Sequence, residues 1–175
     1  MKKNLLLTGI PGSGKTTMIR KLSEVFKEFN PTGFYTAEIT EEGVQAGLFV
    51  ASLYGDSRIL AHVGLKSKYG VGRFRVDVKG FDTMLDNIFS KDKKTGIYFI
   101  DEIGKIECLS RKFCKMVIEL LNTEKPVIAS ISDKGTGIIS EIKKRNDVKL
   151  HEITLENHDL KLKELTMEIR DLLLE

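Results

Sequence analysis

Residues near the start of the chain have the types and the spacing that bind a polyphosphate. The run Gly9-Ile10-Pro11-Gly12-Ser13-Gly14-Lys15-Thr16 fits the pattern G-x-x-x-x-G-K-[ST] at every position, and Thr17 follows it. Gly12 and Gly14 let the backbone curl so that successive N–H groups point at one anion, as in a P-loop. Lys15 is expected to reach the β- and γ-phosphates and Thr16 to ligate Mg²⁺. The run Gly9–Thr17 therefore predicts a nucleotide-binding site.

A carboxylate pair supplies the other half of the expected site. Asp101 and Glu102 follow the apolar run Ile97–Ile100, and acidic residues at the end of a buried strand are the Walker B pattern that lies beside a P-loop. Asp101 would hold Mg²⁺, directly or through water, and Glu102 would polarise the attacking water or accept its proton. We expect catalytic roles for Glu102 and Lys15, metal ligands at Thr16 and Asp101, and further nucleotide contacts at Ile100, Asp101, Glu102, Ile103 and Gly104.

The run Asp101–Gly104 also fits the D-x-x-G element of GTPases, in which the glycine N–H senses the γ-phosphate. No N-K-x-D sequence follows it, which disfavours a Ras-like switch protein.

A basic, glycine-containing segment from Gly64 to Gly80 is the third part of the chain that could take part in the chemistry. Flexible segments of this kind can fold over a nucleotide and place an arginine on the developing phosphoryl charge, a role open to Arg73 or Arg75. The alternative is a solvated loop whose charges face water.

The elements that position these residues follow from the hydrophobic pattern. A short apolar run at Leu5–Leu7 predicts a buried strand before the P-loop, and three- and four-residue spacing from Met18 to Phe29 predicts a helix after it. Asn30–Gly33 is expected to form the turn that ends this helix. The order of strand, loop and helix is the setting that a P-loop requires.

Short β-rich runs follow at residues 33–40, 44–53 and 58–63, separated by turns that contain glycine. Their short connections predict an antiparallel meander. It would serve packing, extend the main sheet at its edge, or form a surface that approaches substrate.

Alternation of strands and helices resumes after a helical pattern at Phe81–Phe89 and a polar connector at Ser90–Gly96. A helix carrying Phe113 precedes a strand at Val127–Ile131, and a second helical run begins at Ile138. A strand-like run at residues 148–155 leads to a final helix. At that junction Asn157 either hydrogen-bonds a base edge or is a helix N-cap.

Composition narrows the class of protein. The 175 residues are 41% hydrophobic, enough for one well-cored domain, and the net charge of +3 gives nucleic-acid binding no support. The apolar start ends at Thr8-Gly9, so it is read as a strand rather than a targeting segment, and no run is long enough to span a membrane. Cys108 and Cys114 have neither zinc-site nor disulfide spacing, which favours a reducing cytoplasm. His62, His151 and His158 form no ligand pattern.

Taken together, the motifs resemble the small nucleoside-triphosphatase family first described from thermophiles, which includes the cancer-related nucleoside-triphosphatase of animals. The resemblance runs along nearly the whole chain and is carried by Thr8–Thr17, Gly33-Phe34-Tyr35-Thr36 with Glu38, Lys68-Tyr69-Gly70-Val71, Asp101-Glu102-Ile103-Gly104-Lys105-Ile106-Glu107, and Asn157 with Asp159. It implies a RecA-like P-loop fold and Mg²⁺-dependent hydrolysis of several nucleoside triphosphates to diphosphate and phosphate. His158 stands where the family usually has arginine, so a contact made by that arginine is in question here.

The expected fold is α/β, a P-loop NTPase with a mostly parallel sheet flanked by helices, and residues 1–175 are expected to form a single domain with the antiparallel insertion at 33–63. The expected activity is nucleoside-triphosphate hydrolysis with broad base tolerance. A small-molecule or nucleotide kinase and a nucleotide-dependent regulatory or nucleic-acid-binding module are the alternatives. Base preference and oligomeric state do not follow from these motifs.

Overall fold

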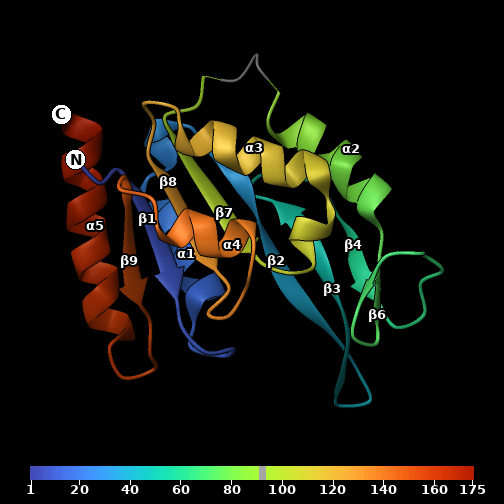
Figure 1. Cartoon of the computed structure of the whole chain (residues 1–175). Helices are drawn as coiled ribbons and strands as arrows, with labels where there is room; N and C mark the ends of the chain where they lie inside the picture. The colour runs from blue at the N-terminus through green and yellow to red at the C-terminus, as the bar shows by residue number, and fades with distance from the viewer. Residues whose placement is uncertain (91–93) are drawn as a thin grey trace.

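The computed structural model of the chain describes residues 1–90 and 94–175. These residues form one nine-stranded mixed sheet in the order β5-β6-β4-β3-β2-β7-β8-β1-β9. Figure 1 shows α2, α3 and α4 in front of the sheet and α1 behind it. The strands are β1 (Asn4–Thr8), β2 (Pro31–Glu41), β3 (Val44–Ser52), β4 (Ser57–His62), β5 (Gly70–Val71), β6 (Phe74–Val76), β7 (Ile97–Ile103), β8 (Val127–Ile131) and β9 (Val148–Glu152). The α-helices are α1 (Lys15–Val25), α2 (Val78–Ile88), α3 (Arg111–Leu121), α4 (Ile138–Lys143) and α5 (His158–Leu174), with 3₁₀ turns η1 (Lys27–Phe29) and η2 (Glu107–Leu109).

The strands β2, β7, β8, β1 and β9 form the parallel part of the sheet. Their carboxyl ends therefore meet at one edge, which receives the loop after β1 and the acidic end of β7. This edge is where ligands bind in open α/β sheets. The predicted P-loop setting, with a strand before it and a helix after it, is confirmed.

Alternate residues of β1 pack on opposite faces of the sheet. Leu5 and Leu7 join a core with Met18 of α1, whereas Leu6 joins the larger core that contains Phe113 of α3. This alternation is the consequence of the two-residue period of a strand. The strand that leads into the loop is therefore packed on both of its faces.

The predicted meander is present, and it extends the main sheet. β3 pairs antiparallel with β2 and β4, while Pro31–Phe34 of β2 pairs parallel with Ile97–Ile100 of β7. The expected turn at Asn30–Gly33 is therefore wrong beyond Asn30, which alone of these residues turns the chain through a left-handed conformation. Proline fits the first position of a strand because no backbone donor is needed there.

Other element boundaries also differ from expectation. Part of the segment Gly64–Gly80 is ordered as the small hairpin β5–β6, because β6 pairs with β4. The last strand ends at Glu152 rather than at residue 155. The residues that follow form a loop, in which the Asn157 side chain hydrogen-bonds the backbone of Glu152 and Thr154. Residues 91–93 of the predicted connector Ser90–Gly96 lie outside the described residues. In the described part of the chain, no helix is both long and apolar enough to cross a bilayer.

Candidate active site

The loop after β1 has the conformation of an anion-binding turn. Gly14 is left-handed, with φ of 94°, and forms the N-cap of α1. A side chain there would also meet the ring of His158, because a Cβ would lie 2.7 Å from its Cδ2 atom. α1 therefore begins at the loop, and the dipole at its N-terminus favours negative charge there.

Lys15 bridges this loop through two of its main-chain oxygens. Its Nζ donates to the main-chain oxygens of Gly9 at 2.6 Å and Ile10 at 3.1 Å. Ser13 is also set for a ligand: its hydroxyl group is buried and, within residues 1–90 and 94–175, has no hydrogen-bond partner. A buried polar atom without a partner is costly, so an incoming acceptor would relieve it.

Asp101 is the centre of a hydrogen-bond network that joins the P-loop to two strands. Its Oδ2 atom accepts from Thr16 Oγ1 at 2.7 Å and from the backbone N–H of Thr36 at 3.3 Å. Its Oδ1 atom accepts from Ser130 Oγ of β8 at 2.6 Å. The network fixes the carboxylate beside Thr16, as the paired motifs predict.

Burial governs the acidity of both carboxyl groups. It raises the pKa of Asp101, which is 2% exposed, while hydrogen bonds from Ser130, Thr16 and Thr36 act in the opposite direction. Burial also raises the pKa of Glu102, and the adjacent charge of Asp101 raises it further. Two carboxyl groups in a desolvated position, with Lys15 as a nearby cation, are typical of a site that gains a charged ligand.

The oxygen atoms beside the loop fit a magnesium ion. Mg²⁺ prefers oxygen ligands and is usually held by one or two carboxylates together with water and substrate phosphates. Thr16 and Asp101 provide a hydroxyl and a buried carboxylate within 2.7 Å of each other. Among the described residues, no group of three or more His, Cys, Asp or Glu side chains could form a separate metal cage.

The structure keeps three predicted residues away from this network. The Asn157 amide serves its own loop: its Oδ1 accepts from Thr154 N at 2.8 Å and its Nδ2 donates to Glu152 O at 3.0 Å. It makes no side-chain cap of α5. Arg73 and Arg75 flank Phe74 at β6, which β4, β3 and β2 separate from β7. Arg73 donates to Gln45 O and lies over the Phe74 ring, so neither arginine reaches the P-loop in this conformation.

Sequence reasoning missed three contributors to the site. Ser130 is a polar residue within an otherwise apolar strand, a signal that could have marked it as a partner for a buried acid. Thr36 acts through its backbone, which no side-chain pattern reveals. His158 reaches the P-loop across the fold, with Nε2 3.1 Å from Gly14 O; the family resemblance marked this position as one of possible contact, but the sequence did not indicate the partner.

Comparison with known protein families assigns the chain to one of them. The profile of a family described as NTPase matches residues 4–166. The chain belongs to the NTPase family. As a member it is an enzyme with the P-loop NTPase fold, and nucleotide binding follows from that membership.

Named relatives of this NTPase cover most of its length. It is 40% identical to the nucleoside-triphosphatase THEP1 of Thermotoga sp. (strain RQ2), over 87% of each chain. It is 36% identical to the human cancer-related nucleoside-triphosphatase, over 90% of this chain and 91% of the human protein. The crystal structure of THEP1 from Aquifex aeolicus matches with a TM-score of 0.84 at 28% identity, covering 95% of this chain and 98% of that one. Sequence and structure therefore agree on the family and on the fold.

Proposed function

We propose that this NTPase is a Mg²⁺-dependent nucleoside-triphosphate phosphohydrolase that releases diphosphate and phosphate and tolerates several bases. The observation that carries the proposal is the network in which Asp101 accepts from Thr16 and Ser130, with Glu102 as the next residue. This network joins the phosphate-binding loop to Asp101. The carboxylate of the next residue, Glu102, takes no part in these hydrogen bonds. The names of the relatives, nucleoside-triphosphatases, support the same reaction.

Each side chain has a distinct task in this proposal. Lys15 would exchange the carbonyls of Gly9 and Ile10 for phosphate oxygens, and Thr16 and Asp101 would hold Mg²⁺. The bound metal would neutralise charge on the β- and γ-phosphates. Glu102 would orient the attacking water and accept its proton, a role for which a pKa raised by burial makes the carboxylate a stronger base.

Broad base tolerance is supported by the β9–α5 loop. A residue that reads a base edge needs free donors and acceptors, yet both ends of the Asn157 amide already bind backbone atoms of Thr154 and Glu152. Strong discrimination between bases requires polar groups left unpaired by the wrong base. With that amide engaged, we expect turnover of ATP, GTP, CTP and UTP to agree within about tenfold.

Phosphate release from each of the four nucleotides, with and without Mg²⁺, tests the proposal. Glu102→Gln should lower turnover by about 10²–10⁴-fold, the usual contribution of a general base, while retaining nucleotide affinity. Glu119→Gln, at an exposed position of α3, is the matched control and should behave as wild type. Undiminished turnover by Glu102→Gln would remove Glu102 from the mechanism.

The same measurement separates hydrolysis from the kinase alternative. A kinase protects its γ-phosphate from water until an acceptor binds. Release of phosphate that begins only after a second substrate is added would therefore contradict the proposal. Labelled RNA and DNA, titrated at low and moderate salt with and without nucleotide, test the regulatory alternative.

A further inference from the structure

Glu107 is a second buried acid that lies against the end of β7 and has no part in the mechanism above. It begins the 3₁₀ turn η2 and is 2% exposed. The neighbouring charges that act on it most strongly are the carboxylates of Glu102 and Asp101. Carboxyl groups are rarely buried beside others of the same sign unless the arrangement has a use.

Gly104 is the gap through which the Glu107 and Glu102 side chains approach each other. A Cβ at Gly104 would lie 2.6 Å from Glu102 Oε1 and 3.0 Å from Glu107 Oε2. The two carboxyl oxygens thus lie on either side of the position that a Cβ atom of residue 104 would take. Only glycine leaves this position empty. The need for glycine here is one of space.

The backbone of the turn holds Glu107 in this position. Cys108 N donates to Gly104 O at 2.9 Å and Ser110 N donates to the main-chain oxygen of Glu107 at 3.1 Å, and the backbone N–H groups of Gly104 and Glu107 oppose the rise in the pKa of its carboxyl group. Burial, followed by the charge of Glu102, raises the pKa of Glu107 well above its ordinary value, which favours the protonated form, and that form can donate a hydrogen bond.

We infer that Glu107 is a positioning residue that sets the place of the Glu102 carboxylate across Gly104. The two carboxyl groups approach each other across Gly104, and a hydrogen bond from the protonated form of Glu107 would keep the Glu102 carboxylate beside Asp101. Supporting groups of this kind hold a catalytic side chain within the narrow range that chemistry requires. The inference rests on the proposed role of Glu102 as the general base.

A matched pair of substitutions separates hydrogen bonding from packing. Glu107→Gln keeps length and hydrogen-bonding groups, whereas Glu107→Met keeps length and places an apolar side chain in a buried position. We expect Glu107→Met to lower kcat about 10- to 100-fold with KM for Mg-ATP unchanged, and Glu107→Gln to stay within about threefold of wild type. Thermal unfolding of both proteins shows whether each folds.

Combination with Glu102→Gln gives the decisive readout. If Glu107 acts through Glu102, Glu107→Met should lower the residual rate of Glu102→Gln by less than about twofold, because its target is already lost. An equal loss in both backgrounds, or wild-type kcat in Glu107→Met, would overturn the inference. Wild-type turnover by Glu102→Gln alone would instead overturn the proposed function.

A substitution on the opposite side of the contact covers the case in which Glu107→Met does not fold. Gly104→Ala leaves Glu107 in place and inserts a methyl group between the two carboxyl groups. It should lower kcat in the wild-type background and have little further effect in Glu102→Gln. Full activity of Gly104→Ala would contradict the inference.

Discussion

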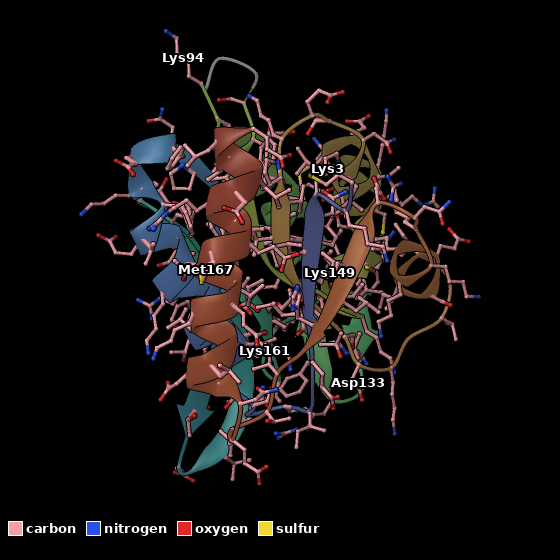
Figure 2. All side chains as sticks on the ribbon, turned by 90° about the vertical axis from the view of Figure 1, so that its left-hand side faces the viewer. Lys3, Lys94, Asp133, Lys149, Lys161 and Met167 are labelled. Carbon is pink, nitrogen blue, oxygen red and sulfur yellow. The ribbon has the colours of Figure 1, made fainter. Side chains whose placement is uncertain are left out.

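Asp101 and Asp147 lie at opposite ends of the parallel strands and have opposite properties. Asp101, at the carboxyl edge of the sheet, is buried among neutral donors, and burial raises its pKa. Asp147, at the amino edge just before β9, accepts from Arg145 Nη2 at 2.7 Å, and this hydrogen bond lowers its pKa. Figure 2 shows the two edges through Lys3, at one end of β1, and Asp133, at the other end of the sheet.

The two edges differ in how completely their charges are matched. At the amino edge, Asn4 Nδ2 bonds both Leu121 O and Asp147 Oδ2 at 3.1 Å, and Lys3 lies 3.8 Å from the same carboxylate. At the carboxyl edge, Asp101 and Glu102 share one nearby cation, Lys15. The amino edge therefore pairs its charges within the fold, whereas the carboxyl edge leaves two carboxyl groups with raised pKa values beside Lys15.

Exchange of each aspartate for asparagine is the strongest test of this contrast. Asp101→Asn removes the proposed metal ligand and should reduce turnover about 10³-fold or more, since a bound metal contributes several kcal/mol of charge stabilisation. Asp147→Asn should leave turnover unchanged. Steady-state phosphate release measures both, and comparable activity of the two variants would break the contrast.

The carboxyl edge was largely predictable because its chemistry is encoded locally. The P-loop is a contiguous run, and Asp101-Glu102 ends an apolar strand, so the paired motifs predicted that they meet. Ser130 could have been marked as a partner for a buried acid, but which acid it bonds, and the contacts of Thr36 and His158, were not predictable, because each depends on strand order or on a helix docking across the fold. The pairing of Pro31–Phe34 with β7 was missed for the same reason: local proline and glycine signals favoured a turn, and long-range strand pairing prevailed.

Two lysines, one at each edge of the sheet, allow a matched comparison, because each donates to a main-chain oxygen. Lys15 Nζ lies 2.6 Å from Gly9 O, and Lys3 Nζ lies 2.6 Å from Leu121 O. Lys15→Met should weaken Mg-ATP binding or turnover by about 10²–10³-fold, the usual effect of losing one preorganised charge contact. Lys3→Met should alter only the free energy of unfolding, by about 1 kcal/mol or less. Nucleotide titration and denaturant unfolding distinguish the two; equal nucleotide affinity would contradict the prediction.

Ser130 tests whether the buried carboxylate depends on its neutral donors. Ser130→Ala removes the 2.6 Å hydrogen bond to Asp101 Oδ1. We expect a loss of about 1.5–3 kcal/mol in the free energy of unfolding and a fall in turnover of about tenfold from the displaced carboxylate. Ser23→Ala, which loses a hydroxyl bonded to Arg20 O at 2.8 Å, is the control and should cost about 0.5–1.5 kcal/mol with turnover retained. A wild-type rate in Ser130→Ala would show that Thr16 and Thr36 suffice.

The smallest expected effect is a difference in pH dependence between the two aspartates. Because the folded pKa of Asp101 is raised above its ordinary 3.8, its contribution to stability is present below that value and is lost as pH rises through the folded pKa. The folded pKa of Asp147 is lowered, so its contribution is present above 3.8 and is lost as pH falls through the folded pKa. Unfolding free energies without metal or nucleotide, measured from acid to neutral pH, should therefore show wild type losing stability relative to Asp101→Asn as pH rises and gaining it relative to Asp147→Asn. The second slope should be shallow, since Asp147 is partly exposed and solvent screens its ion pair. Slopes of the same sign would contradict the contrast between the two aspartates.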